Sequence, residues 1–437
     1  MHAYPPTLEI VPLAKPVDAV VSVPGSKSIT NRALVLAALG SRVTACFLKG
    51  ALRSEDTEVM VDCLTKLGFQ VTWFDDIILV DRNESGRLIP ALEADLYVAN
   101  SGTTIRFLTA MLAAGEGRYR LGGVPRMHER PIGDLLDALQ QLGVRAESET
   151  GNGCPPVVIE TSGLRGGTVR IRADISSQYL SALLMAAPFA DGPVTIELEG
   201  TAVSEPYIFM TEIMMADFDY FVDHFAPGHY RTGTIGNSVT LRGDYTIEPD
   251  ASAASYFFAV AAITGGRILV RGMKRDMLQG DVLFVDALAR MGCIITESAE
   301  GIAVGGRPLR GVDIDMNAIS DTMMTLAAVA CFAEGPTTIR NVAHVRHKET
   351  DRIAAMAAEL RKLGATVDEF DDGLTITPGA LHGATVETYR DHRMAMSLAL
   401  IGFKVSGVVI DDPGCVAKTY PGFWEDLQKL SEGGDGS

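Results

Sequence analysis

The chain repeats one pattern six times along its length. In each copy a polar residue precedes an apolar helix, which is followed by a short strand and a second helix. The first helices are expected to open at intervals of 68 to 76 residues, near Ser28, Ser101, Ser176, Ser252, Ser320 and Asp391. Four of the second helices are expected to end at a glycine, namely Gly68, Gly143, Gly292 and Gly364. A period of this kind predicts an architecture of repeated supersecondary units.

Each copy is predicted to contain helix, strand, helix, strand and strand. The apolar helices of three copies can bury one core, so a chain of 437 residues predicts two domains of three copies each. We expect an α/β (α+β) fold with helices inside and sheets outside, joined by a two-strand hinge near Val23–Ser26 and Gly243–Pro249. The domains are then residues 26–247 and residues 1–25 plus 248–437. The last copy lacks its final strand, which the segment TLEIVPL near the chain start is expected to supply.

The composition restricts the classes of partner. A net charge of −17 argues against the broad basic face that nucleic-acid binding requires. The longest apolar runs are about 11 residues, roughly half of the ~20 needed to span a bilayer, so we expect no membrane partner. The first residues show no signal-peptide pattern, and the six cysteines contain no Cys-X-X-Cys pair. We therefore expect a cytoplasmic protein with reduced thiols and no metal site.

Basic residues gather at the predicted helix openings. In PGSKSITNR, Lys27 and Arg32 flank a helix start, where cations are unfavourable unless an anion neutralises them. In the helix predicted over residues 348–364, Lys348 and Arg352 stand four residues apart in the first turn and would repel each other. Glu349 would form an exposed ion pair with Arg352, and each motif alone also fits an ordinary capped helix. Their recurrence in both halves predicts a cleft for small polyanionic ligands, lined by Lys27, Arg32, Arg106, Arg126, Lys348, Arg352, Arg393 and Lys418.

Taken together, these motifs resemble those of the EPSP synthases (3-phosphoshikimate 1-carboxyvinyltransferases), which are enolpyruvyl transferases. The resemblance rests on PGSKSITNRALVLAAL, NSGTTIR, PRMHERPIG, ISSQYLSALL, VSEPY, KETDR, DHRMAM and AKTYP, in this order along the whole chain. It implies two domains, each of three βαβαββ units, that close over the substrates. The implied reaction transfers the enolpyruvyl group of phosphoenolpyruvate to the 5-hydroxyl of shikimate 3-phosphate and releases phosphate. The resemblance implies no metal and no organic cofactor, and we expect a monomer.

The resemblance also implies roles for individual residues. It assigns catalysis to a base at the target hydroxyl, a proton donor to the methylene group and a lysine, which are Asp321, Glu349 and Lys27. The implied contacts of shikimate 3-phosphate are Lys27, Ser28, Arg32, Ser176, Ser177, Gln178, Ser204, Tyr207, Asp321 and Lys348. The implied contacts of phosphoenolpyruvate are Lys27, Gly102, Arg126, Gln178, Arg352, Arg393 and Lys418. The domain 26–247 would bind mainly shikimate 3-phosphate, and the other domain mainly phosphoenolpyruvate.

The chain departs from the enterobacterial pattern at a few positions. His344 stands where a substrate-contacting Asn is usual, and Ser101 and Phe107 replace other residues near Gly102. Because Gly102 itself is retained, we expect the herbicide glyphosate, which competes with phosphoenolpyruvate in this family, to inhibit the protein.

Two alternatives remain open at this point. The first is the related enolpyruvyl transferase that acts on a UDP-amino sugar, which usually relies on a loop Cys and lacks the KETDR and PGSKS motifs. None of the six cysteines lies in a matching loop. The second is a non-catalytic anion-binding protein built on the same repeats, against which the joint presence of Asp321, Glu349 and Lys27 speaks.

Overall fold

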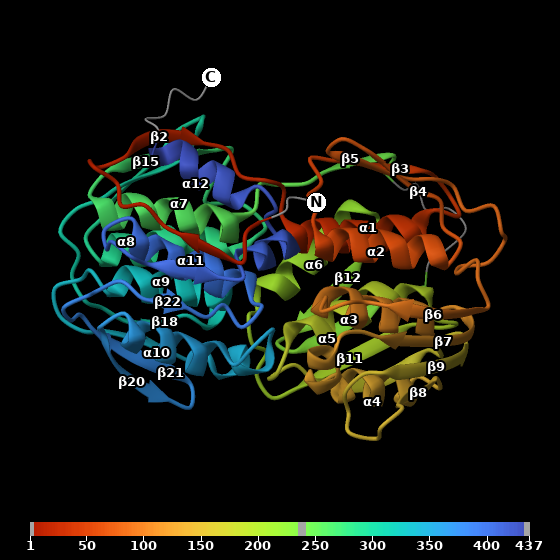
Figure 1. Ribbon diagram of the computed structural model, residues 1–437. Helices are drawn as coiled ribbons and strands as arrows, with labels where there is room; N and C mark the ends of the chain where they lie inside the picture. The colour runs from red at the N-terminus through yellow and green to blue at the C-terminus, as the bar shows by residue number, and fades with distance from the viewer. Residues whose placement is uncertain (1–3, 235–241, 432–437) are drawn as a thin grey trace. The chain divides into compact units, whose positions relative to one another are not determined.

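The computed structural model describes residues 4–234 and 242–431. The chain divides into two compact lobes (Figure 1). We call Gly25–Glu248 the N-terminal lobe, and Met1–Pro24 together with Pro249–Ser437 the C-terminal lobe. The chain therefore crosses between the lobes twice.

The N-terminal lobe contains three four-stranded sheets and six α-helices among its described residues. In sheet order, the strands are β14 (Asp244–Thr246), β3 (Cys46–Lys49), β5 (Ile77–Val80) and β4 (Val71–Phe74); β6 (Glu93–Tyr97), β7 (Glu116–Gly122), β9 (Val157–Ser162) and β8 (Arg145–Ser148); β10 (Gly167–Arg172), β11 (Val194–Glu199), β13 (His229–Thr232) and β12 (Val222–Ala226). The helices are α1 (Lys27–Gly40), α2 (Glu55–Lys66), α3 (Gly102–Ala113), α4 (Gly133–Gln141), α5 (Ser177–Ala186) and α6 (Pro206–Asp217).

All three sheets share one topology, which is that of a βαβαββ unit. The first strand runs parallel to the second, and the second and third both pair antiparallel with the fourth, as in the sheet of β6, β7, β8 and β9. A parallel pair needs a crossover connection, which α3 provides between β6 and β7 and α5 provides between β10 and β11. In the first unit the parallel partner of β3 is β14, which comes from the far end of the lobe.

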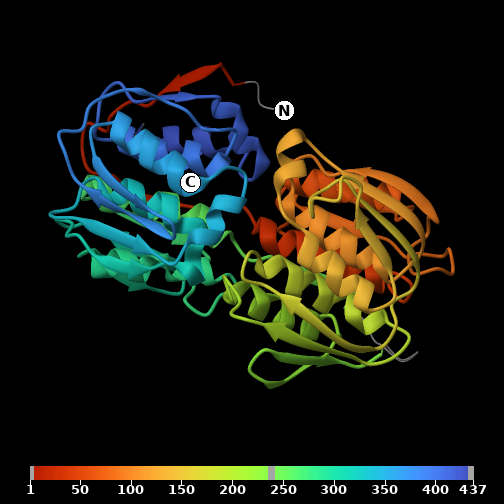
Figure 2. The ribbon, with the colours of Figure 1, turned by 90° about the horizontal axis from the view of Figure 1, so that it is seen from below.

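Three helices form the centre of the N-terminal lobe. Every residue of α3 is buried, and so are thirteen of the fourteen residues of α1. The helices α1, α3 and α5 pack against one another, and the sheets lie outside them, as Figure 2 shows for the strands outside α5 and α6. Apolar residues on all sides of these helices, rather than on one stripe, are typical of helices enclosed by other elements.

The second helices end as the repeat predicts. Gly68, Gly143, Gly292 and Gly364 each follow a second helix and adopt a left-handed conformation, with φ between 84° and 114°. A glycine takes this conformation without a Cβ penalty, which makes it a common helix terminator. In the degenerate third copy Asp219 replaces the glycine and keeps the conformation, with φ at 58°.

The C-terminal lobe repeats the arrangement with one shorter sheet. In sheet order, its strands are β16 (Ile294–Glu297), β17 (Gly301–Gly305), β15 (Arg267–Arg271) and β2 (Asp18–Val21); β18 (Asp313–Asp315), β19 (Thr337–Arg340), β21 (Gly373–Thr377) and β20 (Thr366–Phe370); β1 (Thr7–Glu9), β23 (Val409–Asp411) and β22 (Thr385–Val386). Its helices are α7 (Ala251–Thr264), α8 (Phe284–Arg290), α9 (Met323–Ala330), α10 (Arg352–Lys362), α11 (His392–Gly402) and α12 (Phe423–Ser431). The helices α7, α9 and α11 pack together at its centre.

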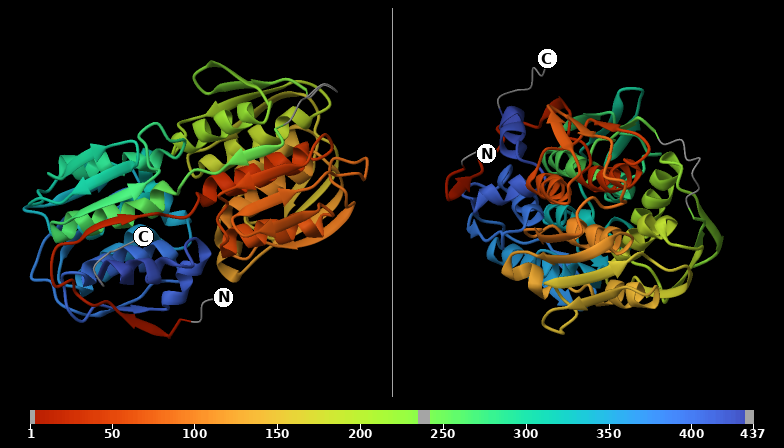
Figure 3. Two further views of the ribbon diagram at one scale, coloured as in Figure 1. Left: turned by 90° about the horizontal axis from the view of Figure 1, so that it is seen from above. Right: turned by 90° about the vertical axis from the view of Figure 1, so that its right-hand side faces the viewer.

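The chain start completes the last repeat, as predicted. Strand β1 pairs antiparallel with β23 and thus takes the place of the fourth strand of a unit (Figure 3). The expected α/β fold of βαβαββ repeats with internal helices is therefore confirmed. Within the described ranges, no helix combines the length and the apolar content that crossing a bilayer requires.

One local prediction is wrong. The helix expected over residues 348–364 begins at Arg352, because the side chain of Asp351 caps it by accepting a hydrogen bond from the amide of Ala354 (3.1 Å). Lys348 therefore lies outside the helix, and the predicted repulsion between Lys348 and Arg352 within one helical turn does not apply.

Candidate functional site

The candidate residues of the C-terminal lobe lie where its central helices begin. The Oγ atoms of Ser255 on α7 and Thr325 on α9 are 3.2 Å apart, and Nη2 of Arg393 on α11 is 3.3 Å from Oγ of Ser252 on α7. These contacts close to the N-terminal ends of the helices show that the three helices start at the same end of the lobe. Three positive helix ends thus converge there, which favours bound anions.

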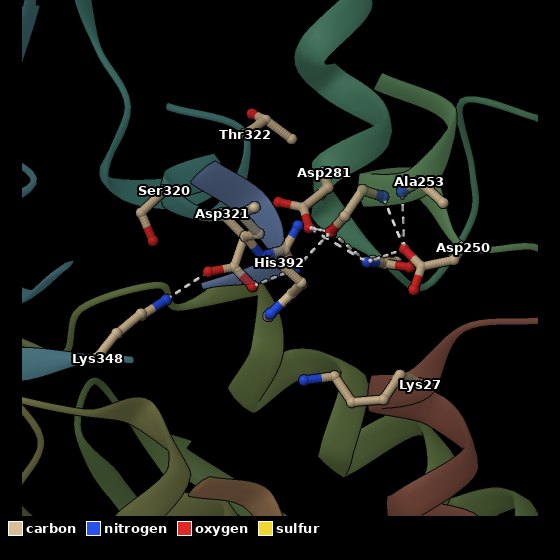
Figure 4. Close-up of polar contacts among 12 residues, drawn as sticks. Lys27, Asp250, Ala253, Asp281, Ser320, Asp321, Thr322, Lys348 and His392 are labelled. Carbon is tan, nitrogen blue, oxygen red and sulfur yellow. Dashed lines mark hydrogen bonds and ion pairs between the residues drawn. The ribbon is translucent and has the colours of Figure 1, made fainter. Parts of the chain in front are cut away.

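Asp321 is the centre of the charged cluster. It lies in the 3-10 segment Asn317–Thr322, just before α9. One carboxylate oxygen accepts from Lys348, as Figure 4 shows. The same oxygen lies 3.5 Å from Nη1 of Arg352, and the other oxygen accepts from Nη2 of Arg393 at 2.8 Å. Burial alone would raise the pKa of this carboxyl group, but the charges of Arg393, Lys348 and Arg352 outweigh it and hold the pKa well below its usual value. Asp321 is therefore ionised, and it is not the N-cap of α9, which is Thr322.

Arg352 is buried among three carboxylates. Its side chain is 1% exposed, with Nε 2.7 Å from Oδ2 of Asp391 and Nη2 2.9 Å from Oε2 of Glu349. The third carboxylate is that of Asp321. Burial opposes its charge, but Asp391, Glu349 and Asp321 raise its pKa above the usual value. The alternative of an exposed pair between Glu349 and Arg352 therefore does not hold, since both side chains are buried.

Glu349 also contacts a second cation. Its Oε1 lies 3.3 Å from Nζ of Lys418, which ends the 3-10 segment Pro413–Lys418. The side chains of Glu349 and Lys418 are 8% and 6% exposed. Glu349 is thus held between the cations Arg352 and Lys418 in a mostly buried place.

Two buried histidines lie beside the cluster and are neutral. Nε2 of His344 is 2.9 Å from Oγ of Ser320, and burial followed by the charge of Lys348 lowers the pKa of His344 to about 3. His392, the first residue of α11, is 1% exposed, and burial followed by the charge of Arg393 lowers its pKa well below the usual value. Asp391, rather than His392, caps this helix by accepting from the amide of Arg393 (2.9 Å).

In the N-terminal lobe, too, the first turns of the central helices meet. Nδ2 of Asn31 on α1 donates to Oγ1 of Thr103 on α3 (2.8 Å), and Nη1 of Arg106 on α3 donates to Oε1 of Gln178 on α5 (3.0 Å). Lys27 is the first residue of α1, and its Nζ lies 3.1 Å from Oδ2 of Asp56. The N-terminal ends of α1, α3 and α5 thus form a second anion-favouring surface with a lysine at its start.

Arg32 is the most enclosed cation of this lobe. Its side chain donates from Nε to Oγ1 of Thr211 (2.7 Å), and its other nitrogens donate to the carbonyls of Ser28 (3.1 Å) and Tyr207 (3.2 Å). It also lies over the rings of Phe107 and Tyr207. Burial lowers its pKa to about 10, so Arg32 keeps its charge at neutral pH.

Gly102 lies against two guanidinium groups. A Cβ atom at this position would lie 2.4 Å from Nη2 of Arg130 and 2.6 Å from Nη1 of Arg106. Nη1 of Arg130 is anchored on the carbonyl of Asn100 (2.8 Å). The structure thus places two arginines beside Gly102. Arg106 was among the cations predicted to line the cleft, whereas Arg130, which stands in the motif PRMHERPIG, was not assigned to the site.

The remaining predicted residues of this lobe occupy its helix starts and one strained turn. Ser176 caps α5 by accepting from the amide of Gln178 (3.3 Å), and Ser177 is the first residue of that helix. Ser204 is buried and has a φ of 50°, a conformation that costs energy in a residue other than glycine. Arg126 is partly exposed and pairs with Glu129 at 2.7 Å.

A pocket of about 490 Å³ lies at the opposite ends of the same helices. It is lined by the ends of α1 and α3 and by the segment that follows α5, including Gly40, Ala114 and Phe189. None of the predicted site residues lines it.

Comparison with known proteins agrees with the motifs. Residues 12–427 match the family described as EPSP synthase (3-phosphoshikimate 1-carboxyvinyltransferase). A protein of Nostoc punctiforme named 3-phosphoshikimate 1-carboxyvinyltransferase is 49% identical over 427 residues, covering 98% of this chain and 99% of that protein. A protein of the same name from a Marinomonas species is 45% identical over 422 residues, covering 96% of this chain and 98% of that protein.

Solved structures give the same result for the fold. The structure of EPSP synthase from Acinetobacter baumannii is similar with a TM-score of 0.79 and 26% identity, and the match covers 97% of this chain and 98% of that one. The enolpyruvyl transferase NikO from Streptomyces tendae shares the fold with a TM-score of 0.76 and 20% identity, covering 97% of both chains. The family match and the full-length relatives together show that this chain belongs to the EPSP synthase family.

Proposed function

We propose that the protein transfers the enolpyruvyl group of phosphoenolpyruvate to the 5-hydroxyl of shikimate 3-phosphate and releases phosphate. Membership of the EPSP synthase family supports this activity, because the relatives span nearly the whole chain. The observation that carries it is the buried cluster in which two carboxylates, Asp321 and Glu349, meet the cations Lys348, Arg352, Arg393 and Lys418. The alternatives of a UDP-amino-sugar transferase and of a non-catalytic binder are not favoured, because the relatives are named 3-phosphoshikimate 1-carboxyvinyltransferase.

The reaction requires both kinds of group. A proton must be added to the methylene carbon of phosphoenolpyruvate, and the acceptor hydroxyl must lose its proton as it attacks the adjacent carbon. The tetrahedral intermediate then loses phosphate and a proton from the new methyl group. Cations stabilise the phosphate and carboxylate charges throughout these steps and keep the reactants aligned.

We assign the proton transfers to the two carboxylates of the cluster. Asp321, which is ionised, accepts the proton of the 5-hydroxyl once the substrate displaces part of its contact with Lys348. Glu349 donates to the methylene group, because an incoming anion draws Arg352 and Lys418 away and makes its protonated form less unfavourable. Lys27 is the third catalytic group of the proposal.

The proposal includes the substrate contacts that the family resemblance implies. We assign the contacts of phosphoenolpyruvate to Lys27, Gly102, Arg126, Gln178, Arg352, Arg393 and Lys418. We assign the contacts of shikimate 3-phosphate to Lys27, Ser28, Arg32, Ser176, Ser177, Gln178, Ser204, Tyr207, Asp321 and Lys348. The C-terminal lobe then binds mainly phosphoenolpyruvate and the N-terminal lobe mainly shikimate 3-phosphate. The proposal further includes a monomeric, cytoplasmic enzyme that glyphosate inhibits in competition with phosphoenolpyruvate.

A phosphate-release assay with purified protein tests the proposal. Phosphate should appear only when phosphoenolpyruvate and shikimate 3-phosphate are both present, and a UDP-amino sugar should not replace the second substrate. Glu349→Gln should still bind both substrates but lose activity by about 10²–10⁴-fold, the usual contribution of a general acid. Glu300→Gln is the matched control, because Glu300 is an exposed carboxylate of the same lobe. Release of phosphate without shikimate 3-phosphate, or normal turnover of Glu349→Gln, would contradict the proposal.

A further inference from the structure

A chain of buried polar groups leads from the second crossing of the chain to Arg393. It consists of Asp250, Gln279, Ser252 and Asp281, none of which belongs to the predicted site, and each is at most 7% exposed. It begins where the two crossing segments meet, since the amide of Asp250 donates to the carbonyl of Pro24 (2.8 Å). Figure 4 shows the contacts that run from Asp250 past Asp281.

The amide of Gln279 has a defined orientation in this chain. Its Oε1 accepts from the backbone N–H of Ala251 (3.0 Å), so its Nε2 must face the other side. There Nε2 lies 3.1 Å from Oδ1 of Asp250, 2.9 Å from Oγ of Ser252 and 3.1 Å from Oδ2 of Asp281. An amide nitrogen only donates and has two protons, so one proton is shared between two of these three acceptors.

The orientation of the Ser252 hydroxyl follows from its neighbours. A hydroxyl group has one proton to donate and two lone pairs that accept. Oγ of Ser252 donates to Oδ2 of Asp281. The two lone pairs then accept from Nε2 of Gln279 and from Nη2 of Arg393 (3.3 Å). The hydroxyl of Ser252 thus uses its proton and both of its lone pairs, and one lone pair accepts from Arg393.

This acceptor holds the guanidinium of Arg393 together with Asp321 of the charged cluster. Nη2 of Arg393 has two protons, which point to Ser252 and to Asp321. Asp250 rather than Ser252 caps α7, accepting from the amides of Ser252 (2.8 Å) and Ala253 (3.1 Å), which leaves the Ser252 side chain available for this role.

We propose that Ser252, oriented by Asp281 and Gln279, is a positioning residue that aligns Arg393 for phosphoenolpyruvate. The inference rests on the proposed function, in which Arg393 contacts that substrate. It predicts that the effect is specific for one substrate: a misaligned Arg393 weakens binding of phosphoenolpyruvate and leaves binding of shikimate 3-phosphate unchanged. If the network had only a structural role, the substitutions would instead change the stability of the protein or change the binding of both substrates alike.

The test compares Ser252→Ala, Ser252→Thr and Asp281→Asn with wild type. Steady-state kinetics give kcat and both KM values, and isothermal titration gives the affinity for phosphoenolpyruvate. Ser252→Ala should raise KM and Kd for phosphoenolpyruvate by about tenfold, the effect of one hydrogen bond to a charged group. Ser252→Thr keeps the hydroxyl and should restore wild-type values. Asp281→Asn should resemble Ser252→Ala, because the amide of the new side chain can donate to Oγ of Ser252 and so reverse the direction of the hydrogen bond between the two residues.

Ser397→Ala provides a matched control. Ser397 is a fully buried serine on α11, one turn after Arg393. Its Oγ has no hydrogen-bond partner among residues 4–234 and 242–431, so its removal should change neither KM. If Ser252→Ala does not fold, Asp281→Asn decides by the same criteria. If the wild type is active and the variants leave both KM values unchanged, or change both equally, this inference alone is overturned. A wild type that does not turn over the two substrates overturns the proposed function and this inference together.

Discussion

Replacing Arg352 by Met should destabilise the C-terminal lobe strongly. The substitution keeps much of the apolar volume but leaves the carboxylates of Asp391, Glu349 and Asp321 without their shared cation, in a place where the arginine is only 1% exposed. Removing one partner of a buried ion pair costs about 3–5 kcal/mol. For a domain of 150–250 residues, 1 kcal/mol shifts Tm by about 2–4 °C, so we expect Tm to fall by roughly 6–20 °C.

Differential scanning calorimetry at two pH values measures this effect and its cause. In the variant the carboxylates that have lost the arginine have raised pKa values, so they take up protons more readily as the pH falls. The difference in Tm from wild type should therefore be smaller at pH 5 than at pH 8. Arg275→Met is the control, since Arg275 forms an ion pair with Asp286 at 2.6 Å but is 41% exposed and should contribute less than about 1 kcal/mol. A Tm shift of Arg352→Met no larger than that of Arg275→Met, or one independent of pH, would refute this reasoning.

Two further predictions concern Gly102 and His344. Gly102→Ala should displace the guanidinium groups of Arg130 and Arg106 and raise KM for phosphoenolpyruvate by about tenfold. Gly133→Ala is the control, because its new Cβ would have its nearest neighbour at 3.6 Å and KM should not change. Equal kinetics of the two variants would contradict the prediction. His344 has a pKa lowered to about 3, so below its unfolded pKa of about 6.5 only the unfolded chain takes up this proton and the fold loses stability as the pH falls. Between pH 7 and pH 5 the free energy of unfolding, measured in urea, should thus fall by about 2 kcal/mol more for the wild type than for His344→Asn. Parallel pH dependences of the two proteins would show that the histidine is not neutral in the folded state.

Much of the site could be predicted from sequence because helix starts carry a recognisable pattern. Asp391 and Ser176 were expected at helix openings, and both cap their helices. The meeting of Lys348, Arg352 and Arg393 around Asp321 was expected only as a gathering of cations at equivalent ends of the repeats. The partners and distances within that gathering depend on side-chain packing, which periodicity does not describe.

Other features could not be predicted because they join distant segments. The roles of Arg106 and Arg130 beside Gly102 depend on how α3 packs against the loop before α4. The start of α10 was misplaced, since Lys348 and Arg352 fit a helical spacing equally well until the cap at Asp351 is known. These are local choices that tertiary contacts decide.

The sequence by itself determined the repeat, the fold class and the family, because a period of about 70 residues and its helix-start motifs are written in residue order. Only the tertiary structure decided which charges are paired, which arginines are buried, and that Ser252 presents an acceptor to Arg393. The physical reason is that burial and hydrogen-bond geometry arise between segments up to hundreds of residues apart, such as α7 and α11, whereas sequence patterns report mainly on neighbours along the chain.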